Sequence, residues 1–212
     1  MVSKDVDDAR RPASKPETGA RLEDRSAPLC VDLDGTIIYT DLLGESIALL
    51  LARKPWLLFV LPFWLLQGRA VLKRRLAAHV KIAPALLPYD EALLAWMSSE
   101  KVSGRQLILA TASDYEPAQA VADHLGLFDE VVASNGRENC KGATKLKHLR
   151  QRFGVNFDYV GNSRADLPIW MESRNAVVVR VSSGLQKKAQ ARARVTRIFN
   201  RNRGFANSLI KC

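Results

Sequence analysis

PLCVDLDGT, residues 28–36, begins as a short apolar run and ends in two acids, a glycine and a threonine. An apolar run that stops at polar turn residues is typical of a buried strand running into a loop. Asp32 and Asp34 stand two positions apart, and Gly35 allows a tight turn directly after them. The stretch therefore predicts a buried strand whose end presents a pair of carboxylates.

Strand-like and helix-like segments alternate after Gly104. The expected strands are 105–111, 130–134, 157–162 and 175–181, and the expected helices are 117–128, 143–153 and 167–173. Such alternation predicts an α/β fold with a Rossmann-like parallel sheet covered by helices on both faces. In these sheets the active site lies outside the carboxyl ends of the strands.

Residues 41–101 have helical patterns throughout, with breaks at prolines. Because this block follows the first strand directly, it predicts an all-helical cap inserted there, above the active site. The expected organisation is a core of 27–40 and 102–184, the cap of 41–101, and a basic C-terminal segment of 185–212. Residues 1–26 are polar and lack apolar periodicity, so we expect them to be disordered.

The acid pair indicates phosphoryl-transfer chemistry. One carboxylate can attack phosphorus while a second group moves protons to and from the leaving oxygen. Two carboxylates this close repel each other unless a cation lies between them, and magnesium is such a cation. The alternative for Asp32 and Asp34 is a solvated acidic turn.

Two other predicted elements carry candidate phosphate ligands. Thr111 ends the second strand, where its hydroxyl and the N–H of Ala112 can bind a phosphate oxygen. Ser113 competes for that role or caps the next helix. Lys145 lies near a helix start and can neutralise the charge on the nucleophile, with Lys141 as its competitor. A solvated helix lysine is the alternative for Lys145.

The loop after the strand 157–162 completes the candidate site. Asn162 and Asp166 can offer oxygen atoms to a metal or its waters. The predicted metal ligands are therefore Asp32, Asp34, Asn162 and Asp166. The alternative is a polar loop that caps the following helix.

These segments resemble the four motifs of haloacid dehalogenase (HAD) phosphatases: DLDGT, LILAT, GATKLKHL and VGNSRADLP. The resemblance implies an Asp32 nucleophile, an Asp34 general acid/base, Thr111 on the phosphate and Lys145 rather than Lys141. It also implies a C1-type helical cap, a Mg²⁺ cofactor and phosphomonoester hydrolysis through an aspartyl-phosphate. Asn162 departs from the pattern, which usually has Asp there, and the lost charge should weaken magnesium binding.

A closer resemblance exists to HAD domains fused ahead of UbiA-type prenyltransferases, carried by DGTIIYTDLLGES, KPWLLFVLPFWLLQGRAVLK, LATASD and FDYVGNSRADLPIW. It implies an isoprenoid-linked or small phosphorylated metabolite as substrate, and a prenyltransferase partner. The alternative function is a non-catalytic or weakly active HAD-like domain associated with such a membrane enzyme. Asn162 favours that alternative mildly, and the intact DLDGT disfavours it.

The net charge of +10 is concentrated near the C-terminus, where residues 173–212 hold ten Lys/Arg and no acid. Residues 185–199 fit a basic amphipathic helix, so we expect the tail to bind an anionic membrane surface. The alternative is a final helix packed on the sheet. Nucleic acid is disfavoured, because the tail has only Phe199 and Phe205 for stacking.

Three scattered cysteines and an N-terminus without an apolar leader favour a cytoplasmic protein. The basic tail would make it peripheral at the inner membrane face. The apolar run 56–66 is eleven residues long, and a bilayer span needs about 20. It fits a buried cap helix or an interfacial segment, and its aromatic residues are expected in the cap core.

Overall fold

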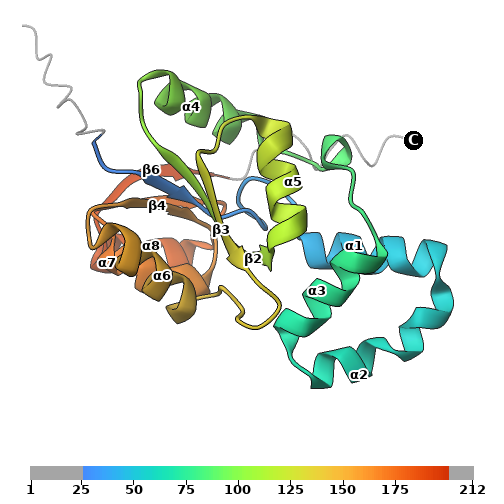
Figure 1. Cartoon of the computed structure of the whole chain (residues 1–212). Helices are drawn as coiled ribbons and strands as arrows, with labels where there is room; N and C mark the ends of the chain where they lie inside the picture. Colours follow the sequence, from blue (N-terminus) through green and yellow to red (C-terminus); the bar gives the residue numbers. More distant parts are fainter. Residues whose placement is uncertain (1–25, 201–212) are drawn as a thin grey trace, which may run out of the picture.

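Six strands pair in parallel into one sheet in the computed structural model, which describes residues 26–200 (Figure 1). Their order across the sheet is β3-β2-β1-β4-β5-β6. The strands are β1 (Leu29–Val31), β2 (Leu107–Asp114), β3 (Glu130–Ser134), β4 (Asp158–Gly161), β5 (Asn175–Val179) and β6 (Val195–Phe199). The predicted parallel α/β sheet is confirmed.

β1 lies at the centre of the sheet because all three of its side chains are apolar and fully buried. Val31 is in register with Leu109 of β2 on one side and Val160 of β4 on the other. The N–H of Asp32 then donates to the Val160 carbonyl at 3.0 Å. This bond fixes the first acid of the pair at the carboxyl end of the central strand.

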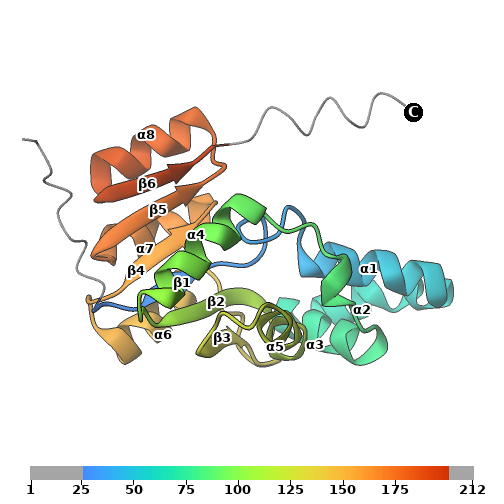
Figure 2. The same cartoon turned by 90° about the horizontal axis from the view of Figure 1, so that it is seen from above.

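Helices cover both faces of the sheet (Figure 2). One face packs on α4 (Glu91–Val102) and α5 (Tyr115–Leu125), and the other on α6 (Ala143–Phe153), α7 (Leu167–Glu172) and α8 (Ser183–Arg192). Two apolar clusters, one on each face, form the main core. A 3-10 turn, η3 (Arg164–Asp166), leads into α7.

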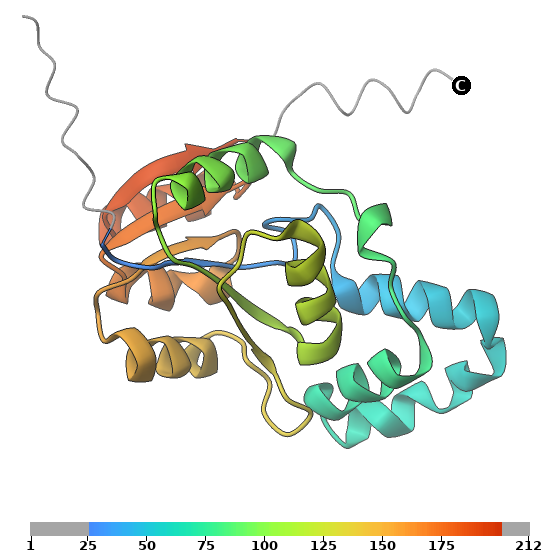
Figure 3. The ribbon, with the colours of Figure 1, turned by 45° about the horizontal axis from the view of Figure 1, so that its top comes forward.

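A helical lobe projects from the carboxyl edge of the sheet (Figure 3). It contains α1 (Leu42–Arg53), η1 (Pro55–Phe59), α2 (Leu61–Leu66) and α3 (Arg69–His79), and η2 (Pro84–Leu86) leads back to the core. The lobe has a small core of its own, made of Leu50, Trp64, Leu72, Leu76 and Val80. None of the helices within residues 26–200 has the length and apolar character needed to cross a membrane.

The predicted boundary of the cap at residue 101 is wrong, because α4 belongs to the core. Leu93 and Met97 of α4 are fully buried and pack with the strands in the main apolar cluster. An amphipathic pattern reveals that a helix buries one face, but not which body it packs against. The lobe therefore ends with α3.

The prediction of one amphipathic helix over residues 185–199 is also wrong. α8 ends at Arg192, and β6 then pairs with β5 at the edge of the sheet. Val195, Thr196 and Ile198 are β-branched, which favours a strand. The basic segment up to Asn200 is thus part of the core fold. The remaining tail, 201–212, and the N-terminal residues 1–25 lie outside the described residues.

Candidate active site

The carboxyl ends of the strands surround a pocket of about 340 Å³. Its lining includes the predicted site residues Asp32, Asp34, Ala112, Ser113, Lys145, Asn162 and Asp166. These residues come from segments up to 134 positions apart, from Asp32 to Asp166, and the parallel sheet brings them to one edge. Thr111 is the predicted residue that does not line this pocket.

Asp32 and Lys145 form a buried ion pair on the wall of this pocket. The Lys145 Nζ donates to Asp32 Oδ1 at 2.6 Å, and the Thr36 hydroxyl donates to Oδ2 at 3.2 Å. Burial raises the pKa of Asp32 to about 6, against the lowering effect of Lys145. Burial lowers the pKa of Lys145, but the carboxylates of Asp32 and Asp166 outweigh it and leave that pKa raised. Lys145 is thus held as a cation against the acid.

Tyr159 connects this pair to the loop after β4. Lys145 Nζ also lies 2.9 Å from the Tyr159 hydroxyl, which donates to Asp166 Oδ1 at 2.9 Å. Asp166 Oδ2 accepts from the N–H groups of Asn162 and Ser163 and from the Ser163 hydroxyl. Asp166 therefore holds the loop in place. Sequence reasoning missed Tyr159, since a tyrosine inside an apolar strand gives no signal beyond core packing.

Asp34 is oriented by three donors. Its Oδ1 accepts the Leu42 N–H at the start of α1, at 2.8 Å. Its Oδ2 accepts hydroxyls from Thr111 at 3.1 Å and Ser113 at 2.7 Å. The second acid thereby ties the core to the first helix of the lobe.

Thr111 has a different place from the predicted one. Its side chain is fully buried, and its hydroxyl donates to Asp34 and accepts the N–H of Ser113 at 3.0 Å. Ala112 and Ser113 line the pocket instead. The hydroxyl of Thr111 is buried because β2 continues to Asp114, three residues past the predicted end of the strand.

Gly35 and Asn162 are in close contact across the site. Gly35 has a φ of +71°, and a Cβ added there would lie 2.1 Å from Asn162 Nδ2. A side chain at position 35 would thus be strained and would displace Asn162. The glycine of DLDGT therefore both makes the turn and leaves room for the β4 loop.

Oxygen donors of the kind that magnesium prefers gather at this end of the sheet. Within residues 26–200, no group of three or more His, Cys, Asp or Glu side chains is arranged to hold a metal. Asp166 already accepts four hydrogen bonds, so its role as a direct ligand stays a prediction. Asp34 accepts three hydrogen bonds, so its role as a direct ligand also stays a prediction. Asp32 and Asn162 remain as candidate ligands, and Mg²⁺ commonly uses one or two carboxylates with waters and phosphate. The donor set fits a weakly held ion.

The lobe contributes cations that sequence reasoning missed or set aside. Lys73 of α3 donates to the Ala112 carbonyl at 2.5 Å and to Asn139 Oδ1 at 3.1 Å. Burial lowers the pKa of Lys73. Arg69 of α3 and Lys141 of the core line the same pocket. With Lys145 they bring four cations to a pocket that four aspartates also line, and this positive charge suits an anionic ligand.

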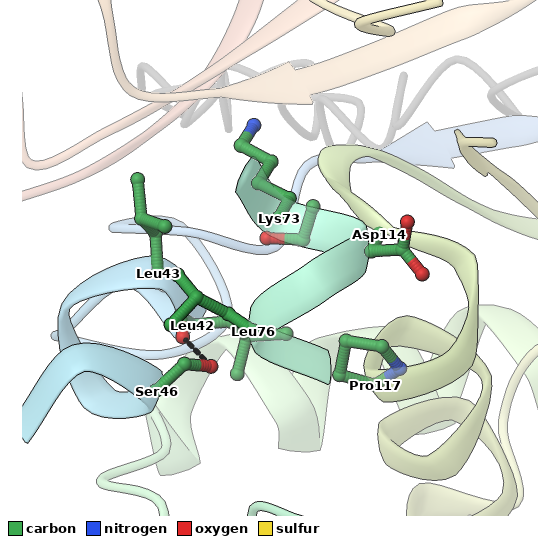
Figure 4. Close-up of a pocket in the computed structure, with 8 residues that line it drawn as sticks. Leu42, Leu43, Ser46, Lys73, Leu76, Asp114 and Pro117 are labelled. Atoms are coloured by element: carbon green, nitrogen blue, oxygen red, sulfur yellow. Dashed lines mark hydrogen bonds between the residues drawn. The ribbon is translucent and has the colours of Figure 1, made fainter. Parts of the chain in front are cut away.

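A smaller cavity, about 10 Å³, marks the seam between lobe and core (Figure 4). α1 contributes Leu42 and Ser46, α3 contributes Lys73 and Leu76, and the start of α5 contributes Pro117. The Ser46 hydroxyl donates to the Leu42 carbonyl at 2.7 Å. Apolar and polar contacts both close this seam, since the ion pair of Arg74 with Asp114 also joins lobe and core, and Lys73 belongs to both cavities.

No protein-family model matches the chain. A curated relative is the uncharacterized protein y4nM of Sinorhizobium fredii, which is 40% identical over 157 residues. That alignment includes 74% of this chain but only 30% of the relative. The chain thus spans less than a third of that protein.

Solved structures match the fold. A phosphoserine phosphatase in its apo form has a TM-score of 0.56 at 13% identity, with 82% of this chain and 92% of that chain covered. A HAD family hydrolase from Salmonella enterica serovar Typhi has a TM-score of 0.57 at 14% identity, with 84% and 69% covered. The chain therefore has the α/β fold, with its parallel six-stranded sheet, that is found in HAD phosphatases.

Proposed function

We propose that the chain is a magnesium-dependent phosphomonoester hydrolase of the HAD type. The observation that carries this proposal is the buried Asp32–Lys145 pair at the carboxyl end of β1, facing a pocket that three further cations line. A carboxylate at that place can form an aspartyl-phosphate intermediate.

In the first step, one Asp32 oxygen attacks phosphorus and the bond from phosphorus to the substrate oxygen breaks. Lys145 keeps Asp32 ionised and correctly oriented, since it donates to Oδ1 and leaves Oδ2 with only the Thr36 hydroxyl. Lys73, Arg69 and Lys141 line the same pocket and would supply positive charge to a bound phosphate. Stabilising charge in this way is commonly the largest contribution to phosphoryl transfer.

Asp34 serves as the general acid and then as the general base. It gives a proton to the leaving oxygen, and it takes one from the water that hydrolyses the aspartyl-phosphate. Two of its three donors are hydroxyls, from Thr111 and Ser113, and hydroxyls can rotate to accept. Oδ2 can therefore carry the proton without breaking the Leu42 contact on Oδ1.

Magnesium, held by Asp32 and Asn162, would neutralise the charge that gathers when a phosphate meets three carboxylates. Asp34 and Asp166 add negative charge that favours the ion. Both raise the pKa of Asp32, which shows that their fields reach it.

We further propose an isoprenoid-linked or small phosphorylated metabolite as the substrate. We also propose that the chain acts in the cytoplasm, in association with a UbiA-type prenyltransferase. The sequence resemblance supports these points. The greater length of y4nM is consistent with them, because most of that relative lies outside the matched region.

A second candidate is a non-catalytic HAD-like domain. Asn162 in place of an acid, together with the four hydrogen bonds already made to Asp166, favours it. The intact acid pair and the ordered donors on Asp34 favour the enzyme.

Phosphate release from a panel of phosphomonoesters, measured with magnesium and with a chelator, tests the proposal. Asp32→Asn should lower turnover by roughly a thousandfold or more while the fold persists. Asp123→Asn, at an exposed position of α5, is the matched control and should keep full activity. A folded chain that hydrolyses nothing in the panel would support the non-catalytic domain instead.

A further inference from the structure

The outer edge of the lobe carries a dense group of exposed apolar side chains. Seven of the thirteen large apolar side chains that are exposed within residues 26–200 fall in residues 51–66. They are Leu51, Trp56, Leu58, Phe59, Phe63, Leu65 and Leu66, which we call the cap-edge surface. Phe59 and Leu66 are 85% and 86% exposed. Apolar groups gathered this way mark an interaction site.

These side chains cannot be the aromatic cap core expected from the sequence. Trp64 alone among the four aromatic residues of this segment is buried, at 4% exposed, and packs in the lobe core. Leu57, Val60 and Leu61 pack against the same core. Trp64, Leu57, Val60 and Leu61 therefore fill the positions that face the lobe core. The side chains of the cap-edge surface are left exposed on the opposite side of the segment. Figure 1 shows η1 and α2 at the far side of the lobe from the sheet.

The charge around this surface has one sign. Residues 46–89 contain seven Lys/Arg and no Asp/Glu. Arg53 and Lys54 directly precede the apolar run, and Arg69 follows it. The Arg75 guanidinium lies over the Trp64 ring, 5.9 Å from its centroid. Arg53, Lys54 and Arg75 are therefore the cations available to this surface, whereas Arg69 and Lys73 line the active-site pocket and Arg74 pairs with Asp114.

We propose that the cap-edge surface docks onto an anionic lipid bilayer. Phenylalanine, tryptophan and leucine side chains enter the boundary between headgroups and acyl chains, while the framing arginines and lysines meet anionic headgroups. Residues 46–89, with seven Lys/Arg and no Asp/Glu, complement anionic headgroups, and this favours an anionic bilayer over a neutral apolar partner. The inference does not rest on the proposed catalysis, since none of the cap-edge residues lines the active-site pocket.

Vesicle co-sedimentation of the full chain tests the proposal. The probes are vesicles of phosphatidylcholine alone and vesicles with about one third phosphatidylglycerol. We expect binding to the anionic vesicles that weakens as salt rises. The double variant Phe59→Gln/Leu66→Gln should bind at least about tenfold more weakly, because it removes apolar surface that would be buried in the bilayer.

Leu86→Gln/Val102→Gln is the matched control, because these side chains are 85% and 89% exposed and lie outside the cap-edge surface. It should bind as the parent chain does. Thermal unfolding of both double variants checks that the fold is intact, as expected for substitutions at exposed positions.

Trp56 gives a direct second readout because it is 62% exposed, whereas Trp64 and Trp170 are buried and Trp96 is half-buried against Phe199 in the core. Anionic vesicles should shift its emission to shorter wavelength, and Trp56→Phe should remove most of that shift while binding remains. Four outcomes overturn the proposal: no binding at low salt, undiminished binding by the Phe59/Leu66 variant, equal loss in the control, or self-association in solution that the variant abolishes.

Discussion

Tyr159 shows how single residues build this site. Its hydroxyl lies between Lys145 and Asp166, so it joins the Asp32–Lys145 pair to the loop that carries Asn162. Burial raises the pKa of Tyr159 well above its ordinary value, and the neighbouring acids act in the same direction. The phenol therefore stays protonated and acts as a permanent donor to Asp166.

Thr111→Val distinguishes two roles for this residue. A phosphate ligand would raise KM when lost, whereas a positioning residue on Asp34 would lower kcat and leave KM nearly unchanged. The burial of Thr111 and its bond to Asp34 favour the second result. Removing the buried hydroxyl should also cost about 1–3 kcal/mol of stability, since the Ser113 N–H loses its acceptor.

Steady-state kinetics and thermal unfolding measure these two effects. Thr196→Val, at an exposed position of β6, is the control and should change neither. A raised KM with normal kcat would contradict the positioning role of Thr111.

Asn162→Asp should tighten magnesium binding because it adds a charged oxygen ligand. Without the ion, the new acid joins Asp32, Asp34 and Asp166 and should lower the melting temperature. Titration of activity and of melting temperature against magnesium measures both effects. Asn156→Asp, in the exposed turn before β4, is the control. An unchanged half-saturation point would show that Asn162 does not face the metal.

At the scale of elements, the sequence predicted the strands well where local pattern and packing agree. β2 to β5 and α5 to α7 lie where the alternation placed them. The prediction was wrong where the element that a segment packs against or pairs with decides its structure. α4 has an apolar stripe that fits the cap or the core, and Val195–Phe199 becomes a strand because β5 offers an unpaired edge.

In the site too, local motifs predicted some residues, and tertiary packing alone brought in others. The residues named by motifs, such as Asp32 and Lys145, meet as expected. The packing of β4 brings Tyr159 to the site, and the packing of the lobe brings Lys73 there. No local sequence pattern predicts the role of either residue. A lysine on a helix is usually solvated, so the contact of Lys73 with the Ala112 carbonyl could be found only in three dimensions.

The separate cores of lobe and sheet predict separate local stabilities. Leu76→Ala, in the lobe core, should speed amide hydrogen exchange in α1, α2 and α3 and leave the strands protected. Met97→Ala, in α4, should destabilise the whole chain by about 2–5 kcal/mol. Both side chains are buried, at 1% and 0% exposed, so each serves as the control for the other. If Leu76→Ala accelerated exchange equally in the sheet, the lobe and core would unfold as one unit.

The whole molecule depends on its last two described elements, α8 and β6. Leu185 and Ala189 of α8 are buried in the cluster on one face of the sheet. The N–H of Arg180 donates to the Phe199 carbonyl, and the N–H of Ala176 donates to the Arg194 carbonyl. Losing these contacts would expose the apolar strand β5 as an edge.

A chain ending at Gly184 should therefore fail to unfold cooperatively and should aggregate, because an exposed apolar edge strand pairs with other chains. A chain ending at Asn200 keeps every contact described here and should melt within a few degrees of the full chain. Calorimetry and size-exclusion chromatography of the two truncations measure this difference. A soluble, cooperatively folded chain ending at Gly184 would show that α8 and β6 are an appendage, as the sequence first suggested, rather than part of the core.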